Sequence, residues 1–357
     1  MKKVLAVILS ITIAVALGLT FAGCKAETVE TTAATETTAA AETTAAAETT
    51  AAAADVKIAY YWPQAHPYYE SVLKGQAKFV EKYGIDVFSQ IGTGWDLQTE
   101  NEQVEALVAQ GYKGLAVYPV DASGTNSLYE EVVAAGTFVC SYGAQTKVPT
   151  PASFTLATDV KAAAMAATEK VIETMGKKGN ILNIIEYVED PNSILRKEGV
   201  EEVVAKYPDV KIIQTIAGMD SIEECTEKIG NALSGLGDQV NGMVTTGYNP
   251  TVAAAQILTE MKNDSIAYVG IDDDPIVLKA IEDGFVTGTF AQSPYFQGYV
   301  TPILLMYLIQ GHESKGFVFI DTYGIVVTKD NLGTFADELW DAAFKAGDTA
   351  LETWFKS

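Results

Sequence analysis

Polar and aromatic side chains follow several strand-like segments of this chain, and their chemistry suits a ligand rich in hydroxyl groups. The carboxylate of Asp272 can accept several hydrogen bonds from hydroxyls, and the amide of Gln292 can both donate and accept them. The faces of Tyr68 and Tyr69 can cover an apolar surface of a ligand. Because adjacent residues on a helix point in different directions, we expect one of these tyrosines to stack on a ligand and the other to belong to the core.

Strand-like and helix-like segments alternate from residue 56 onward, and this alternation positions the polar residues. Helical spacing at 66–83 and 97–111 separates short apolar runs that are typical of buried strands. This alternation of strands and helices predicts parallel sheets covered on both faces, and the number of strands favours two doubly wound α/β lobes. The predicted strands are 56–62, 85–91, 113–118, 137–142, 153–158, 180–187, 210–217, 240–246, 265–271 and 286–291.

Residues just after the strands are the functional candidates, because open parallel sheets bind ligands beyond the carboxyl ends of their strands. Asp190-Pro191 and Asp274-Pro275 each place an N-capping carboxylate before a proline suited to a first helical turn. The rule of strand ends selects residues 66–69 and 94–96, Tyr142, Glu186, Met219, Tyr248, Asn249, Asp272 and Gln292.

Three consecutive aspartates, Asp272 to Asp274, raise the question of a metal site. Consecutive side chains diverge, and no further oxygen ligands stand at a recognisable spacing. We therefore expect a ligand-binding residue followed by a helix cap, and no metal.

Composition excludes several classes of function. The 357 residues are 48% hydrophobic and 20% charged, which is enough for two domains with their own cores. A net charge of −22 has the wrong sign for binding nucleic acid or anionic lipids. Three cysteines and two histidines leave little material for a disulfide scaffold, a zinc site or a histidine-based acid and base pair. Cys140 and Cys225 are expected to be free, buried thiols.

No sequence pattern indicates a cofactor or a reaction. Gly92-Thr93-Gly94 lacks the remaining glycine of a dinucleotide fingerprint and the lysine of a phosphate-binding loop. A nucleophile elbow is also missing from the sequence. We therefore expect neither a cofactor nor enzymatic activity.

The N-terminus has the features of an export signal. Lys2 and Lys3 precede an almost uninterrupted apolar run over 4–22, and Phe21-Ala22-Gly23-Cys24 resembles a bacterial lipobox. The prediction is a lipoprotein signal peptide at 1–23 and lipidation of Cys24. A retained transmembrane anchor is the alternative, and both place the rest of the chain outside the cytoplasm. Residues 24–55, nearly all alanine, threonine and glutamate after the cysteine, are expected to be a solvated tether.

Residues 56–332 resemble the periplasmic sugar-binding proteins of the ribose, galactose and xylose type, which share their core with lactose-repressor-like regulators. The resemblance is carried by His66-Pro67-Tyr68-Tyr69, by Arg196-Lys197-Glu198-Gly199, and above all by 269–275 with 290–294. It implies the type I periplasmic binding protein fold, with two doubly wound lobes joined by a three-segment hinge. The implied lobes are 56–158 with 293–322, and 159–292 with 323–357, crossing near Asp159, Gln292 and 322–324.

The resemblance also implies roles for particular residues. Asp272 would accept sugar hydroxyls, Arg196 would donate to ligand oxygens, and Gln292 would lie in the cleft. His66 takes the place of a polar residue that bonds a sugar hydroxyl. Met219 lies where the family often has an aromatic residue that faces the sugar ring. Tyr248 or Asn249 lies where the family has an amide side chain. The predicted ligand-binding residues are His66, Tyr68, Tyr69, Trp95, Tyr142, Arg196, Met219, Tyr248, Asn249, Asp272 and Gln292.

Two departures from the family and three alternatives bear on these residues. Ser141-Tyr142-Gly143 stands where the family frequently has an Asp-Arg pair, and His66 replaces the usual asparagine. His66 could instead be a surface residue at a helix start. Trp95 either lines the cleft or packs a loop. Arg196 could pair with Glu198 or Glu201 on its own helix.

The predicted function is that of an extracytoplasmic, membrane-tethered substrate-binding lipoprotein. Its two lobes would close around a monosaccharide or related polyhydroxy compound and present it, as a monomer, to the permease of an ABC importer. The alternative is a sensory binding protein that delivers a sugar or an autoinducer-2-like signal to a membrane receptor. A repressor is disfavoured, because the signal and tether occupy the place of its DNA-binding helices.

Overall fold

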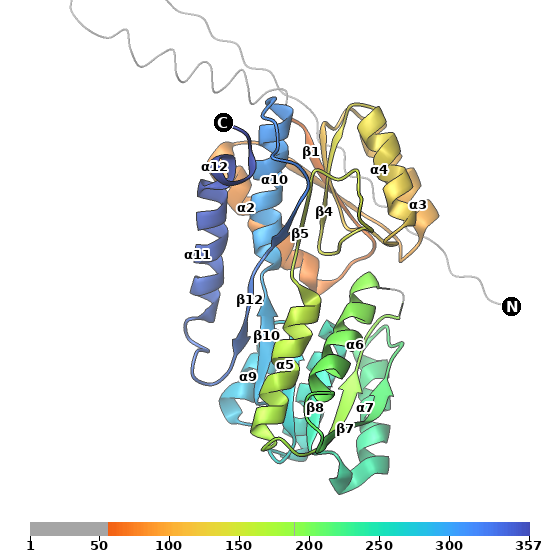
Figure 1. Cartoon of the computed structure of the whole chain (residues 1–357), viewed down its shortest axis with the longest axis vertical. Helices are drawn as coiled ribbons and strands as arrows, with labels where there is room; N and C mark the ends of the chain where they lie inside the picture. Colours follow the sequence, from red (N-terminus) through yellow and green to blue (C-terminus); the bar gives the residue numbers. More distant parts are fainter. Residues whose placement is uncertain (1–55, 189) are drawn as a thin grey trace, which may run out of the picture. The chain divides into compact units, whose positions relative to one another are not determined.

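The computed structural model describes residues 56–188 and 190–357. The predicted signal peptide, Cys24 and the whole predicted tether lie outside the described residues. The described part of the chain forms two six-stranded sheets flanked by helices (Figure 1), which confirms the predicted α/β fold class. No helix among these residues is both long enough and apolar enough to cross a membrane.

The first sheet has the strand order β11-β5-β4-β3-β1-β2, and every neighbouring pair is parallel. Burial on both faces explains why its central strands are apolar throughout. Its strands are β1 (Ile58–Trp62), β2 (Val87–Ile91), β3 (Gly114–Val117), β4 (Phe138–Tyr142), β5 (Phe154–Ala157) and β11 (Val318–Asp321).

The second sheet has the order β12-β10-β9-β8-β6-β7, in which β12 alone runs antiparallel to its neighbour β10. The other pairs are parallel, so their carboxyl ends share one edge. Its strands are β6 (Gly179–Ile184), β7 (Val210–Ile216), β8 (Gly242–Thr245), β9 (Ala267–Ile271), β10 (Gly288–Gln292) and β12 (Gly324–Val327).

Two strands were absent from the sequence prediction. β11 and β12 have four residues each and pair with strands far away in sequence, since Val318 stands beside Phe154 and Val327 beside Thr289. Each therefore depends on a long-range pairing that local periodicity does not reveal.

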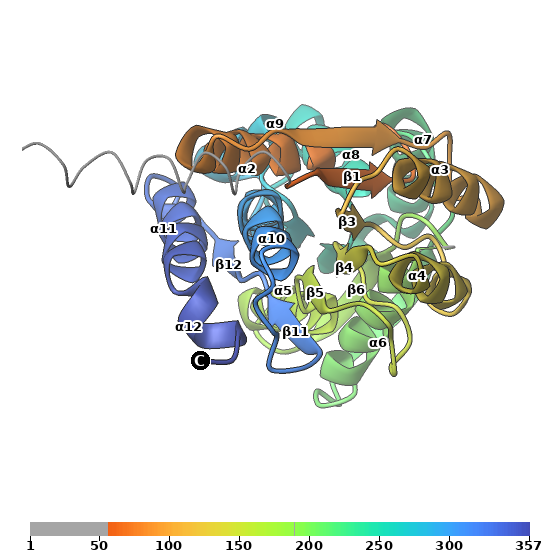
Figure 2. The ribbon, with the colours of Figure 1, turned by 90° about the horizontal axis from the view of Figure 1, so that it is seen from above.

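Helices connect and cover the sheets, as Figure 2 shows from above. Asp190 and Asp274 accept hydrogen bonds from the backbone N–H groups of Asn192 and Ile276, which confirms both predicted helix caps. The helices are α2 (Pro67–Tyr83), α3 (Leu97–Ala109), α4 (Gly124–Ala134), α5 (Val160–Thr174), α6 (Pro191–Val204), α7 (Ile222–Leu236), the 3-10 turn η1 (Gly237–Gln239), α8 (Tyr248–Met261), α9 (Pro275–Asp283), α10 (Pro294–Ile309), α11 (Phe335–Asp348) and α12 (Ala350–Trp354).

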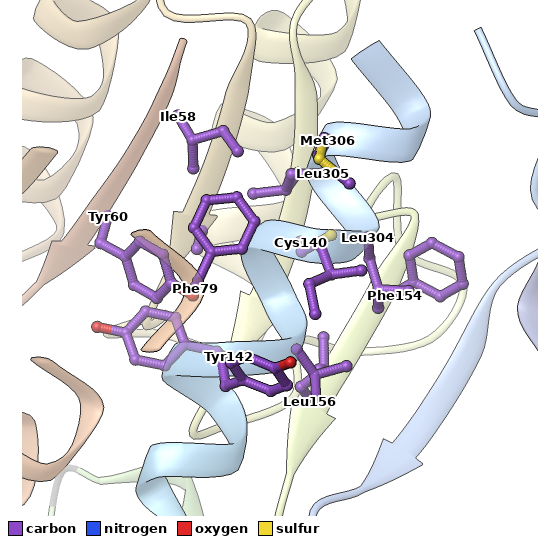
Figure 3. Close-up of a cluster of buried hydrophobic side chains, with 14 of the residues drawn as sticks. Ile58, Tyr60, Phe79, Cys140, Tyr142, Phe154, Leu156, Leu304, Leu305 and Met306 are labelled. Carbon is purple, nitrogen blue, oxygen red and sulfur yellow. The ribbon is translucent and has the colours of Figure 1, made fainter. Parts of the chain in front are cut away.

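The core of the first lobe lies between its sheet and helices α2 and α10. Figure 3 shows Phe79 of α2 and Leu304 of α10 among apolar side chains from β1, β4 and β5. Glycines let the two helices approach closely. A Cβ added to Gly298 would collide with the backbone oxygen of Val72, and one on Gly75 would lie 2.8 Å from the backbone nitrogen of Tyr299. The free, buried Cys140 in this core and Cys225 in the second lobe confirm the predicted state of both thiols.

The chain passes between the sheets at three places. These lie between β5 and α5, between β10 and α10, and between β11 and β12. Hydrogen bonds connect two of the crossings: the hydroxyls of Thr158 and Thr322 lie 3.4 Å apart, and the backbone N–H of Asp159 donates to Asp321 over 3.2 Å.

The C-terminal segment forms two helices, α11 and α12. Trp340 of α11 stacks on Tyr295 of α10 with ring centroids 4.3 Å apart, while Leu339 packs with Val327 of β12. β12 thus belongs to the second sheet, whereas α11 touches elements of both lobes. The exact lobe boundaries stay a prediction.

Candidate functional site

A cavity opens where the carboxyl ends of strands from both sheets face each other. It contains about 550 Å³ of space free of protein atoms, including its opening to solvent. Ligand sites of α/β proteins typically lie at this position, beyond the carboxyl ends of the strands. The structure brings these predicted residues together around it: His66, Tyr68, Tyr69, Trp95, Arg196, Tyr248, Asp272 and Gln292.

Three predicted residues do not line the cavity. Tyr142 ends β4 with its side chain in the core of the first lobe, where its hydroxyl donates to the carbonyl of Tyr61 over 3.2 Å. Met219 is fully buried in the core of the second lobe. Asn249 lies behind the cavity wall, and its backbone N–H donates to Glu186.

The lining also includes residues that were not among the predicted site residues. Most of them stand within three positions of a predicted one, or on the α6 start that Asp190 caps. They are Gln64, Tyr118, Gly143, Glu186, Tyr187, Asp190, Asn192 and Gly247.

His66 is the N-cap of α2 and presents a fixed donor to the cavity. Its Nδ1 accepts a hydrogen bond from the backbone N–H of Tyr68 over 3.2 Å, so the neutral ring carries its proton on Nε2. Burial, together with the positive charge of Arg196, lowers the pKa of His66 from 6.5 to about 4. Nε2 is buried and has no hydrogen-bond partner among the described residues. His66 is therefore part of the cavity wall.

Aromatic rings form much of the wall. Tyr69 is buried and stacks on Trp62, with centroids 5.1 Å apart and an 11° angle between the ring planes. Tyr68 is half-buried, and its hydroxyl donates to Oε1 of Gln297 over 2.8 Å. Trp95 meets Tyr118 edge-on at 5.6 Å, and its indole Nε1 is a buried donor with no partner in the described part of the chain. Tyr68 and Trp95 are thus the rings with the most freedom to meet a ligand.

Asp272 and Gln292 lie together, at the ends of β9 and β10. The side-chain amide of Gln292 donates to Oδ1 of Asp272 over 2.7 Å. Asp272 has a φ of 71°, a left-handed conformation that is uncommon outside glycine and occurs most often with Asn and Asp. Burial raises the pKa of its carboxyl from 3.8 to about 6. Because Gln292 bonds to Oδ1 alone, the second carboxylate oxygen of Asp272 is available to a ligand.

Arg196 belongs to a buried charge pair. Its guanidinium lies 3.6 Å from Oδ2 of Asp190, and the two side chains are only 11% and 7% exposed. Glu198 and Glu201, the alternative partners on the helix, pair with lysines. Burial raises the pKa of Asp190, against the opposing effect of Arg196. Nε of Arg196 is buried and has no partner among the described residues, which leaves it for a ligand oxygen.

Glu186 is a buried carboxyl at the N-terminus of α8. Its Oε1 accepts a hydrogen bond from the backbone N–H of Asn249 over 3.3 Å. Gly247 makes room for it, since an added Cβ there would collide with the carboxyl group. Burial raises the pKa of Glu186 from 4.5 to about 8, although Asn249 and Arg196 act in the opposite direction.

Side chains of the two lobes touch across the cavity. Nδ2 of Asn192 donates to the hydroxyl of Tyr118 over 3.2 Å and to the carbonyl of Gly143 over 3.1 Å. His66 and Tyr248 meet edge-on with centroids 5.3 Å apart. The cavity is thus bounded by both lobes at once.

Known proteins are similar to this chain in sequence and in fold. The model of a family described as "Periplasmic binding protein domain" matches residues 58–313. The xylitol-binding protein of Mycolicibacterium smegmatis is 26% identical over 295 residues, which cover 76% of this chain and 83% of that protein. The xylose/arabinose-binding protein of Sulfolobus acidocaldarius is 21% identical over 253 residues, covering 66% of this chain and 62% of that protein. The solved structure of an ABC transporter solute-binding protein from Burkholderia graminis, in complex with D-arabinose, has a TM-score of 0.73 and 23% identity, covering 79% of this chain and 98% of that one.

Proposed function

Because this chain belongs to the periplasmic binding protein domain family, we propose that it is the extracytoplasmic substrate-binding lipoprotein of an ABC importer. The family consists of substrate-binding proteins, so the chain is a binding protein and not an enzyme. Its relatives are solute-binding proteins of sugar transporters, which implies a membrane permease as the partner. In our proposal the ligand is a monosaccharide or a related polyhydroxy compound.

The mixed hydrogen-bonding capacity of the cavity is the observation that carries this proposal. His66 Nε2, Trp95 Nε1 and Arg196 Nε are donors without partners among the described residues. Asp272 and Glu186 supply carboxyl oxygens to the same cavity. A polyol satisfies both kinds of group, because each hydroxyl donates one hydrogen bond and accepts others. The ring of Tyr68 or Trp95 then covers the apolar face of the ligand.

Five-carbon sugars and alditols are the first ligands to test. The relatives named above bind xylitol, or xylose and arabinose, and the Burkholderia structure holds D-arabinose. Tyr142, which stands where the family frequently has an Asp-Arg pair, faces the core of the first lobe. In our proposal Tyr118 and Gly143 therefore make the ligand contacts in that region.

The placement of the site supports the proposed closure of the lobes around the ligand. Asp272, Gln292, Arg196 and Glu186 come from the second lobe, whereas His66, Tyr68 and Trp95 come from the first. A ligand that bonds to both sets favours the closed arrangement by the free energy of those contacts. The permease would then bind the closed form in preference to the open form.

Lipid anchoring through Cys24 completes the proposal and has its own test. Metabolic labelling with a fatty acid should mark the chain, and the label should disappear in Cys24→Ala. Persistent labelling of this variant would contradict the proposed lipid anchor. It would leave the proposal for the ligand site unaffected.

Binding is tested by thermal shift and calorimetry on the purified protein after unfolding and refolding to remove carried ligand. A compound that binds only the folded state raises the unfolding midpoint. We expect a selective response to one monosaccharide or alditol, and its loss in Asp272→Ala, Arg196→Ala and Gln292→Ala. A folded protein that responds to no member of a panel of five- and six-carbon sugars and alditols contradicts the proposed ligand class.

A further inference from the structure

We propose that the preferred ligand carries a positively charged amine on its polyhydroxy skeleton, as amino sugars and amino alditols do, and that the ammonium lies beside Glu186 and Asp272. This inference rests on the proposed function and narrows its ligand class. Three features of the cavity support it: an excess of buried carboxyls, a wall of aromatic rings, and an acidic rim.

The carboxyls of the cavity outnumber its cations. Glu186, Asp190 and Asp272 line it, and Arg196 is the guanidinium that faces them. Arg196 is already paired with Asp190, at 3.6 Å. The other two carboxyls have no salt bridge among the described residues. An ionised carboxylate removed from water without a partner of opposite charge is costly.

Glu186 is the carboxyl with the greatest need of a cation. Its side chain is only 5% exposed, and in the described part of the chain its Oε2 has no hydrogen-bond partner. Asp272 and Asp190 add to the burial that raises its pKa, so neighbouring negative charge is part of its environment. An ammonium bound beside Glu186 and Asp272 would favour release of the proton of Glu186 and would then compensate both carboxylates at once.

Aromatic rings surround the same space. Tyr68, Tyr118, Tyr187, Tyr248 and Trp95 all line the cavity. The negative face of an aromatic ring attracts ammonium groups, and cages of such rings recognise amines in other proteins. Burial raises the pKa of Tyr68 and Asp272 adds to it, while the pKa of Tyr248 is raised by burial, then by Asp274 and more weakly by Asp272, so the carboxyl of Asp272 lies near both rings. Carboxylate and ring faces are therefore available to one cation.

The opening beside the cavity is acidic as well. A second hollow shares Tyr68, Tyr248 and Asp272 with the cavity and continues past α2 and the start of α9. We define the acidic rim as Glu70, Asp273 and Asp274 with one opposing cation, Lys74. Negative potential at an entrance attracts cations and repels anions. Sugar acids and sugar phosphates are thus disfavoured at both the rim and the cavity.

Matched pairs of neutral and aminated ligands test the inference. The probes are D-glucose, D-glucosamine and N-acetyl-D-glucosamine, the same series from galactose, and sorbitol with N-methyl-D-glucamine. We expect the amine of the best pair to bind about tenfold or more tightly than its neutral counterpart by calorimetry near pH 7. Acetylation should abolish the advantage, because it removes the charge. Equal or weaker binding of the amines, while neutral sugars bind, overturns this inference and leaves the proposed function standing. Failure of every probe together with the five-carbon panel overturns both.

Two substitutions test whether the preference for an amine arises from Glu186 in the cavity. Glu186→Gln keeps the shape of the side chain but cannot ionise beside a bound ammonium, so the ratio of amine to neutral affinity should fall about tenfold. Glu198→Gln changes an exposed acid of α6 that pairs with Lys161 and lies outside the lining of the cavity. This variant should keep the ratio of amine to neutral affinity of the parent protein. An unchanged ratio in Glu186→Gln contradicts the proposed position of the ammonium. If Glu186→Gln does not fold, the comparison of acetylated and free amines on the parent protein decides the question.

Discussion

The amide of Asn192 bonds across the cavity to the hydroxyl of Tyr118, over 3.2 Å, and so joins the second lobe to the first. The same Nδ2 donates to the carbonyl of Gly143 over 3.1 Å. The backbone N–H of Asn192 donates to Asp190, whose other oxygen faces Arg196. Asn192 thereby connects the closure of the lobes to the charged groups of the site.

Asn192→Ala is expected to favour the open state. It removes two hydrogen bonds and leaves the buried carbonyl of Gly143 without this partner, which costs roughly 1 to 3 kcal/mol. Ligand affinity should fall about tenfold, mainly through faster dissociation. Fluorescence transfer between dyes on the two lobes should show a larger open fraction. Asn231→Ala, on the exposed side of α7, is the control. Unchanged dissociation and unchanged transfer would contradict a role for Asn192 in closure.

His66 is expected to act as a hydrogen-bond donor through Nε2. His66→Asn and His66→Asp both supply a good N-cap for α2, so helix stability changes little in either variant. Only asparagine retains a donor, and a carboxylate at this position also repels ligand oxygens. Affinity of His66→Asp for the identified ligand should be about tenfold or more below that of His66→Asn. Equal affinities, measured by calorimetry, would exclude donation by His66.

The fold was largely predictable because local signals agreed with the tertiary structure. The ten predicted strands are all present, and the polar caps Asp190 and Asp274 mark two helix starts correctly. β11 and β12 escaped prediction because each depends on pairing with a strand far away in sequence, which no local pattern reveals.

The site was predictable to the level of strand ends, but not of side-chain direction. Tyr142 and Gly143 are neighbours, yet the tyrosine side chain enters the core and the glycine lines the cavity. Alternation at a strand end turns successive side chains to opposite sides, so an error of one position exchanges core and cavity. Met219 also enters the core, in the second lobe, although it follows a strand.

Glu186 and Tyr118 show two different limits of prediction. Glu186 was selected by the rule of strand ends but left out of the predicted site, because no motif gave a reason to bury a carboxyl there. Tyr118 ends a predicted strand and offers no local signal, since its position depends on Trp95 and Asn192 from elsewhere in the chain. Such residues follow only from the assembled lobes.

Gly298 is expected to be essential for packing α10 on α2. A Cβ on Gly298 would collide with the backbone oxygen of Val72, so Gly298→Ala must push the two helices apart. Overpacking of this kind destabilises by about 1 to 3 kcal/mol or more. Gly230→Ala on α7 meets nothing within 4 Å and should instead stabilise by about 0.5 to 1 kcal/mol, because alanine is the better helix former. Urea unfolding of both variants checks the signs. Equal effects would contradict the close approach of the two helices.

Glu186 is expected to make stability decrease with rising pH. Its pKa is raised from 4.5 to about 8 in the folded protein, so the folded state retains a proton that the unfolded chain releases. The resulting stabilisation is complete below about pH 4.5 and is lost as the pH rises through about 8. One such group changes the free energy of unfolding by at most about 1.4 kcal/mol per pH unit.

Urea titrations between about pH 6.5 and about pH 8.5 measure this effect while Asp272, with a pKa of about 6, is mostly ionised. Glu100 has a pKa raised to about 7 by burial and titrates in the same interval, so the informative quantity is the difference between variant and parent. Glu186→Gln should lose stability less steeply than the parent over this range, because it has no proton to release. Glu198→Gln should follow the parent, since that carboxyl is half exposed and pairs with Lys161 at 3.8 Å. A Glu186→Gln profile parallel to that of the parent would mean that the folded protein holds this carboxyl ionised, with a cation or a donor beside it.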